Sequence, residues 1–255
     1  MSRAGRTGAR AGGGRGRLGH TLSSAAVAIG CVLFLGGFGW TAVLYQPYTV
    51  PTDSMAPTVN AGDRVLAQRI DGDQVKRGDI VVFRDPVWGE LPMAKRVVGV
   101  GGDTVKCCDG QGRLTVNGTA VDEPYLRQGA RERASFPSFE AAVPQGHLFL
   151  LGDHRDQSLD SRTHLQDANH GSVRREAVTG RIDATVWPPG TMGLVERPES
   201  FADLPGGISR PGPLRPALLA TAAGAALVLG GAAYGAITSV RGRRARLTHN
   251  GGTHG

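Results

Sequence analysis

Two long stretches without a charged residue flank the chain, one near each end. They cover residues 21–45 and 217–240, and neither contains Asp, Glu, Lys or Arg. At about 1.5 Å of rise per residue, a helix of either length can cross a hydrocarbon core roughly 30 Å thick. The pattern therefore predicts two transmembrane helices. It leaves residues 46–204 as a domain between them and residues 205–216, rich in Pro and Gly, as a linker.

Between these stretches the hydrophobic positions come in short segments that are typical of β-strands. The segments cover residues 79–84, 93–100, 113–116, 146–151 and 181–187, and most end at Gly, Pro or Asn. Asn117-Gly118 follows the third segment and is typical of a type I′ hairpin turn. Long amphipathic helical periodicity is absent, so we expect a mainly antiparallel β fold. Residues 127–142 are polar and irregular, and we expect them to form an exposed excursion.

The basic character of the chain belongs to its two ends. The net charge is +7. Arginines gather before the first apolar stretch and after the second, with no acidic residue among them: Arg3, Arg6, Arg10, Arg15, Arg17, Arg241, Arg243, Arg244 and Arg246. The domain between the stretches is therefore not basic, and we expect no nucleic-acid partner. The positive-inside rule predicts that tails 1–20 and 241–255 are cytoplasmic and that the domain lies outside the membrane.

The first apolar stretch is predicted to be a retained anchor and not a cleaved leader. It is much longer than the ~7–15 apolar residues of a secretory signal, and no small-x-small site follows it. Of the three cysteines, Cys31 lies within this stretch, whereas Cys107 and Cys108 are adjacent in the outer domain. No cysteine or histidine spacing is typical of a metal site, so we expect neither a metal nor a cofactor.

Two residues of the outer domain suggest nucleophilic chemistry. Ser54 comes soon after the first apolar stretch, between Pro51 and Pro57. A serine attacks poorly unless a base removes its proton. Lys95 lies in an apolar predicted strand, and burial there would lower its pKa and let the neutral amine act as that base. The pattern therefore favours a Ser-Lys hydrolytic dyad beside a membrane.

A third polar cluster follows an apolar strand at residues 152–162. It contains three Asp, two Arg and two Ser in eleven residues. Asp160 and Arg162 are spaced to form an ion pair that braces a site. The Ser158 hydroxyl is a candidate for holding a lysine amine in position.

The sequence resembles bacterial type I signal peptidases in several blocks. These are Pro51-Thr52-Asp53-Ser54-Met55-Ala56-Pro57-Thr58, residues 78–83, Lys95-Arg96-Val97-Val98-Gly99 with Gly102-Asp103, and residues 152–162. The resemblance implies that Ser54 is the nucleophile and Lys95 the general base. It also implies that Thr52 contributes to the oxyanion hole and that Ser158 orients the lysine. Asp160, Arg162 and Asp153 would be structural residues near the site.

The resemblance further implies a fold, a substrate and a location. The fold would be an antiparallel β catalytic core with a small β cap. The substrates would be signal peptides of exported preproteins, cut after small-x-small motifs such as Ala-x-Ala. The expected partners are the lipid bilayer and the secretion translocon, and the expected location is the bacterial cell membrane. Residues expected to line the substrate pockets are Tyr48, Val50, Met55, Val59, Met93 and Ala94.

Some positions depart from the commonest family pattern, and two other functions stay open at this stage. Asp53, His154 and Gln157 replace more frequent residues of the family, which affects fine specificity. A Ser-His-Asp hydrolase would need an external histidine such as His154 as its base, but no Gly-x-Ser-x-Gly motif is present. A membrane-tethered, non-catalytic peptide-binding domain would keep the groove without needing Lys95. Self-cleaving repressors share the dyad, but this chain has no helix-turn-helix pattern.

Overall fold

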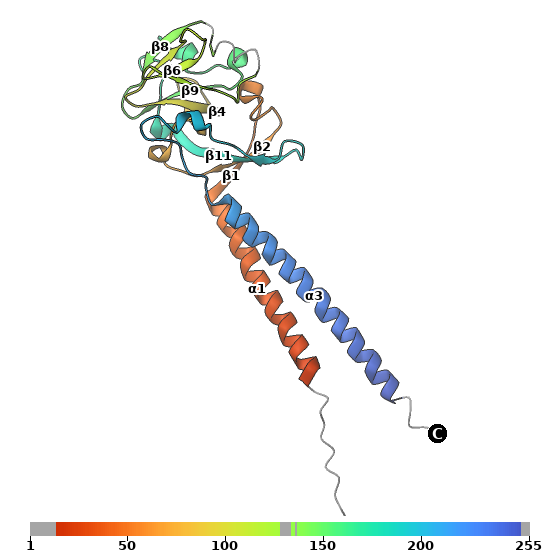
Figure 1. Cartoon of the computed structure of the whole chain (residues 1–255). Helices are drawn as coiled ribbons and strands as arrows, with labels where there is room; N and C mark the ends of the chain where they lie inside the picture. The colour runs from red at the N-terminus through yellow and green to blue at the C-terminus, as the bar shows by residue number, and fades with distance from the viewer. Residues whose placement is uncertain (1–13, 128–133, 136, 251–255) are drawn as a thin grey trace, which may run out of the picture. The chain divides into compact units, whose positions relative to one another are not determined.

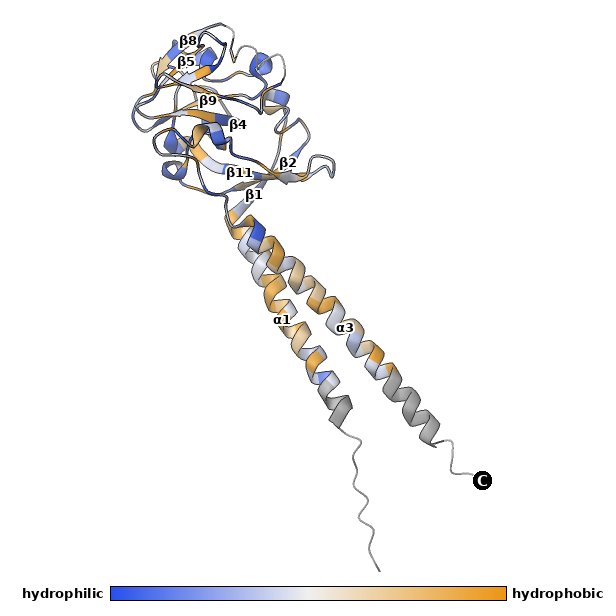
Figure 2. Cartoon of the chain, viewed as in Figure 1, coloured by the Kyte–Doolittle hydropathy of each residue, from blue (hydrophilic) through white to orange (hydrophobic). Residues whose placement is uncertain are grey.

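The computed structural model describes residues 14–127, 134–135 and 137–250 and divides into two compact units (Figure 1). One unit combines residues 1–42 with residues 213–255, and the other is residues 43–212. The first unit contains two helices, α1 (Gly14–Leu44) and α3 (Leu214–Asn250). Segments Gly19–Leu44 and Leu214–Val240 are long and apolar enough to cross a membrane. Apolar colours accordingly predominate along both (Figure 2).

The two helices pack antiparallel through small residues spaced seven apart. A Cβ on Gly30 would lie 2.8 Å from the Gly224 carbonyl oxygen, and one on Gly37 would lie 2.8 Å from the Ala217 carbonyl oxygen. In the same register, the Ser23 hydroxyl donates a 2.7 Å hydrogen bond to the Gly231 carbonyl. A seven-residue repeat keeps one face of each helix on its partner, and small side chains let the backbones approach closely. The pairing therefore continues over several turns of both helices.

We expect Gly224→Leu to separate these helices, because a Cβ at Gly224 would lie 2.3 Å from the Phe34 backbone nitrogen. The reporter is a disulfide between Ser23→Cys and Gly235→Cys in a Cys31→Ser background. The Cβ positions of residues 23 and 235 are 3.8 Å apart, close to the usual disulfide separation. We expect oxidative crosslinking to fall by more than about half in Gly224→Leu, since the clash is with backbone that cannot yield.

Gly36→Leu is the matched control for this prediction, because a Cβ on Gly36 meets nothing within 4 Å. It adds the same bulk to an open face of α1 and should leave the crosslink intact. Full crosslinking in Gly224→Leu, or none in the parent protein, would contradict the packing described above.

The second unit is built from two antiparallel sheets, in agreement with the expected fold class. The larger has the order β1-β2-β11-β3-β4-β9-β10, with β12 also pairing β11, and the smaller has the order β7-β6-β5-β8 (Figure 1). The strands of the larger sheet are β1 (Tyr45–Thr49), β2 (Arg64–Gln68), β3 (Ile80–Asp85), β4 (Gly89–Val100), β9 (His147–Leu151), β10 (Val173–Arg174), β11 (Val178–Trp187) and β12 (Gly193–Leu194). Those of the smaller sheet are β5 (Thr104–Cys107), β6 (Leu114–Val116), β7 (Thr119–Val121) and β8 (Phe139–Ala142).

The predicted hairpin turn is confirmed, whereas the predicted excursion is wrong at its end. Asn117 and Gly118 have φ values of 53° and 80°, as a type I′ turn requires, and they connect the paired strands β6 and β7. Part of the excursion, residues 128–133 and 136, lies outside the described residues. Within the rest, Phe139 and Ala141 of β8 are buried in the apolar core of the small sheet. Two buried apolar positions in a strand of four residues are too few to reveal this alternation in the sequence.

The predicted linker is fastened to the domain over part of its length. Arg77 donates a 2.7 Å hydrogen bond to the Pro205 carbonyl, and Lys76 donates one of 2.7 Å to the Gly206 carbonyl. The Ser209 hydroxyl donates to Asp79, a carboxyl whose pKa is raised because burial penalises its charged form. These contacts hold residues 205–209 against the sheet that carries the candidate site.

Candidate active site

Ser54 lies in a short 3-10 turn, η1 (Asp53–Met55), between the end of β1 and β2. The backbone N–H of His154 donates a 3.1 Å hydrogen bond to the Ser54 carbonyl. The Thr52 hydroxyl donates to Ser54 Oγ at 3.3 Å. Ser54 is only 9% exposed, and it lines a groove at the surface of the domain.

The Lys95 amine reaches Ser54 from the neighbouring strand β4. Lys95 Nζ donates to Ser54 Oγ at 2.8 Å, and the lysine is 5% exposed. Burial lowers the pKa of Lys95 to about 8, an effect that Asp160 and Asp153 oppose and Arg162 assists. Roughly a tenth of the amine is therefore neutral at pH 7, against less than about a thousandth for an exposed lysine. The distance and the lowered pKa thus permit proton transfer from Ser54 Oγ to Lys95 Nζ.

The loop after β9 contributes a tight ion pair. The Arg162 guanidinium donates two 2.8 Å hydrogen bonds to the two oxygens of Asp160. Asp160 also accepts a 2.9 Å hydrogen bond from the Gly152 N–H. A bidentate pair of this kind fixes the loop geometry more firmly than a single contact would.

Ser158 does not make the hydrogen bond to Lys95 that the resemblance implies. Its hydroxyl is buried and has no hydrogen-bond partner among the described residues, so it is not bonded to Lys95 here. A Cβ at Gly152 would come within 2.1 Å of Ser158 Oγ. Glycine at position 152 therefore lets the Ser158 side chain pass close to the strand end.

A second buried ion pair lies beside the dyad. Arg96 follows Lys95 on β4, and its Nε and Nη2 donate to the Asp153 carboxylate at 2.8 and 2.6 Å. Thr58, four residues after Ser54, donates to the same carboxylate at 2.6 Å. Burial disfavours the Arg96 cation, but Asp153, Tyr125 and Glu123 together outweigh this, so the pKa of Arg96 is raised. The segments that carry Ser54, Lys95 and Asp153 are thus joined by one charged group.

The ion-pair network extends into the segment after β7. Arg155 is buried and pairs with Glu123, which also accepts a hydrogen bond from the Tyr125 hydroxyl. Arg96 stacks over the Tyr125 ring, with its guanidinium carbon 3.9 Å from the ring centroid.

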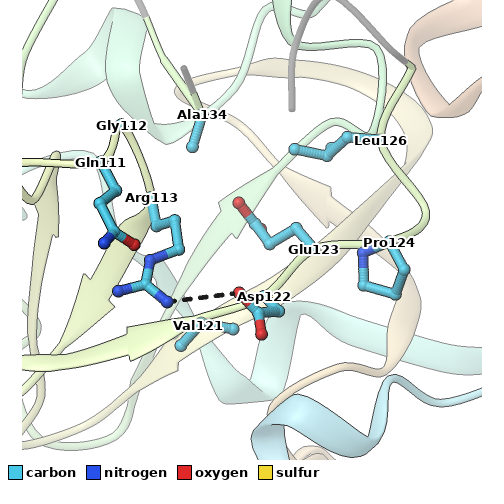
Figure 3. A pocket seen from close by; sticks show the side chains of 9 residues that line it. All are labelled: Gln111, Gly112, Arg113, Val121, Asp122, Glu123, Pro124, Leu126 and Ala134. Atoms are coloured by element: carbon cyan, nitrogen blue, oxygen red, sulfur yellow. Dashed lines mark ion pairs between the residues drawn. The ribbon is translucent and has the colours of Figure 1, made fainter. Parts of the chain in front are cut away.

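Figure 3 shows Glu123 at the edge of a hollow of about 320 Å³ that Asp122 and Arg113 also line. The described residues that line this hollow include neither serine nor lysine, and we assign it no chemistry.

A mostly apolar groove of about 550 Å³ lies beside the dyad. Five of the expected pocket residues line it: Tyr48, Val50, Met55, Met93 and Ala94. Val59, the sixth, is fully buried in the core cluster that contains Val50 and Met55. Val59 therefore supports the groove from behind, because its side chain points into the core.

Sequence reasoning missed several residues that build this region. Arg96 was overlooked although a second basic residue in an apolar strand is an unusual signal. Trp88, Leu91 and Ile182 also line the groove, and they come from a turn and from two strands. Such a surface depends on sheet register, which single strand patterns do not reveal.

The side-chain contact of the alternative base His154 is with the backbone of Asp53 and not with the Ser54 hydroxyl. Its Nδ1 lies 3.2 Å from the Asp53 carbonyl oxygen. Ser54 Oγ already has Lys95 and Thr52 as partners. The described geometry therefore favours the lysine as the proton acceptor.

Comparison with known proteins identifies a family for the chain. A family model described as "Signal peptidase, peptidase S26" matches residues 20–187. "Probable signal peptidase I" of Mycobacterium leprae (strain TN) is 32% identical over 206 residues, covering 59% of this chain and 71% of the relative. "Signal peptidase I U" of Bacillus subtilis (strain 168) is 33% identical over 161 residues, covering 59% of this chain and 80% of the relative.

A crystal structure of a signal peptidase I from Enterococcus faecalis V583 is also similar. It has 31% sequence identity and a TM-score of 0.33, and the match covers 42% of this chain and 94% of that one. Because the family model spans most of the chain, the chain belongs to the signal peptidase family, peptidase S26. It is a serine peptidase of the signal peptidase I type, and therefore a hydrolase.

Proposed function

We propose that this protein removes N-terminal signal peptides from exported preproteins, cutting after small-x-small motifs such as Ala-x-Ala. The observation that carries the proposal is the 2.8 Å contact between the buried Lys95 amine and the Ser54 hydroxyl. Membership of the signal peptidase family supports the substrate class.

In the proposed mechanism Ser54 Oγ attacks the carbonyl carbon of the scissile peptide bond, and the neutral Lys95 amine accepts the serine proton. The Ser54 N–H and the Thr52 hydroxyl stabilise the oxyanion as it forms. Lys95 then donates its proton to the leaving amine. The neutral Lys95 amine then takes a proton from water, which attacks the acyl ester and releases Ser54.

The groove supports the preference for small side chains. Val50, Met55 and Ala94 line it close to Ser54, and Met55 is almost completely buried. A close-packed wall of this kind resists the insertion of a large side chain, because neighbouring core residues cannot move cheaply. Alanine at the first and third positions before the cut fits without such movement.

The helix pair supports a membrane-bound enzyme with both termini on one side. Antiparallel spans return the chain to the side from which it started, and the arginine-rich tails favour the cytoplasm. We therefore place the β domain outside the membrane, where preproteins emerge. The lipid bilayer and the secretion translocon are then its proposed neighbours.

The test is cleavage of an exported preprotein by the purified full chain in detergent. The proposal predicts a mature product whose new N-terminus follows the Ala-x-Ala motif. Replacing the alanine directly before the cut by Trp should block cleavage. A chain that binds the preprotein without cutting it would instead be a tethered binding domain.

The activity should rise with pH through about 8. The neutral Lys95 amine is the active form, and its pKa is lowered to about 8, so the rate should fall roughly tenfold per pH unit below that value. A kcat/KM profile between pH 5.5 and 9.5 measures this. A midpoint near 6.5 would instead indicate a histidine base, and a flat profile would remove Lys95 from the mechanism.

A further inference from the structure

The groove beside Ser54 continues beyond the expected pockets to a turn between two strands. Trp88 and all five residues 91–95 of β4 line it. Successive side chains of a strand point to opposite faces, so a groove lined by each in turn runs along the strand edge. Strand β9 pairs with β4 only from Arg96 onward. On that side, residues 91–95 face no other strand of the described chain.

Trp88 is held at the far end of this groove by two rings. The Phe83 ring meets the indole edge-on, with centroids 5.4 Å apart and planes at 83°. The His164 ring stacks on it, with centroids 4.6 Å apart and planes at 10°. His164 is itself fixed by a 2.8 Å contact between its Nδ1 and Asp167. The indole is therefore a pre-positioned apolar surface that remains only half-buried.

The spacing along β4 identifies the part of a substrate that would reach Trp88. An extended peptide and a strand both advance about 3.3 Å per residue. If one residue of the substrate lies beside Lys95, the residue four positions away from it therefore lies beside Leu91. Trp88 lies one residue before the start of β4. The substrate residue beside it is therefore about two to three positions further along the peptide than the residue beside Leu91. Met93 and Ala94, which are expected to line the pockets for small side chains before the cut, lie between Leu91 and Lys95 in β4. Positions that reach Leu91 and Trp88 therefore also precede the cut.

We propose that Trp88, together with Leu91, is a specificity-determining subsite for a large apolar side chain four to seven residues before the cut. This inference rests on the proposed function. In secretory signals an apolar h-region precedes the small-x-small motif, and its last residues are the occupant. Contact between an aromatic surface and a leucine side chain removes apolar area from water and so stabilises the complex. This contribution does not depend on the pocket for alanine.

The experiment compares peptides that share an Ala-x-Ala site and carry Leu or Ser at each position from four to seven before the cut. For the wild type we expect Leu at one of these positions to raise kcat/KM about tenfold, mainly through KM. In Trp88→Ala this preference should fall below about twofold, while the requirement for Ala-x-Ala persists. Trp88→Phe should keep most of it.

Val87→Ala is the matched control, because Val87 is exposed beside Trp88 and does not line the groove. Its preference for Leu should equal that of the wild type. An undiminished preference in Trp88→Ala, or an equal loss for every peptide, would overturn the inference. Circular dichroism of each variant excludes a folding defect as the cause of an equal loss.

Failure of the proposed function has a separate signature. If the wild type cuts no peptide, fluorescence anisotropy of the same labelled peptides on Ser54→Ala still tests the subsite. Tighter binding of the Leu peptide that disappears in Ser54→Ala/Trp88→Ala would support the subsite in a protein that does not cleave. Equal binding of Leu and Ser peptides to Ser54→Ala would refute it.

Discussion

Lys95→Met is expected to lower the cleavage rate of an Ala-x-Ala preprotein by at least about a thousandfold. Methionine fills nearly the same space but has no amine to accept the Ser54 proton across the 2.8 Å contact. Ser54→Ala should cause a loss of the same order. The double variant should be no slower than either single one, because the two side chains act as a unit. Single-turnover kinetics in detergent, with enzyme in excess, measures all three rates.

His154→Ala is the control that separates this mechanism from a histidine-based one. The His154 side chain contacts the Asp53 carbonyl, and its loss should leave the rate within about tenfold of the wild type. Loss of activity in His154→Ala with an intact fold would move the base to that residue. A Lys95→Met protein that cleaves at the wild-type rate would show that Lys95 is not the base.

Arg96→Met is expected to cause the largest loss of stability. The pair of Arg96 and Asp153 is 1% exposed on each side, so removing the cation leaves a buried carboxylate without its main partner. Breaking a buried pair in this way costs about 3–5 kcal/mol, which corresponds to a fall in Tm of roughly 10 °C for a domain of this size. Thermal unfolding of the full chain in detergent, followed by circular dichroism, measures the shift.

Two variants make this result interpretable. Arg96→Met/Asp153→Leu removes both charges and should recover a large part of the lost Tm, because no buried charge is left unpaired. Lys106→Met breaks the cross-strand pair with Glu140, whose side chains are 55% and 59% exposed, and should shift Tm by less than about 3 °C. Equal shifts for the buried and exposed pairs would show that burial does not set their strengths.

The sequence predicted the fold class because its signals were local. Uninterrupted apolar runs predicted the two helices, and Asn117-Gly118 predicted the hairpin turn. Strands β1 and β2 were missed because each has only five residues, too few to establish an alternation. Strand β8 was missed for the same reason. Only pairing with β5 reveals that Phe139 and Ala141 belong to a core.

The dyad could be proposed from sequence, whereas its surroundings depended on tertiary contacts. A lysine in an apolar strand is a local signal, and the structure places Lys95 Nζ 2.8 Å from Ser54 Oγ. The bond between Glu123 and Arg155 joins residues 32 apart in sequence, and the stacking of Trp88 on His164 joins two loops. Contacts between residues so far apart cannot be predicted from a periodic pattern in the sequence. The packing of the two helices likewise depends on small residues from both, such as Gly30 of α1 and Gly224 of α3.

The most direct test of the central claim is the mass of the product formed from an exported preprotein by the purified full chain. The account predicts a single new N-terminus directly after Ala-x-Ala with the wild type, and uncut preprotein with Ser54→Ala. A cut elsewhere in the preprotein would contradict the proposed specificity. The same product from Ser54→Ala, or no product from a correctly folded wild type, would contradict the assignment of Ser54 and Lys95 as a peptidase dyad.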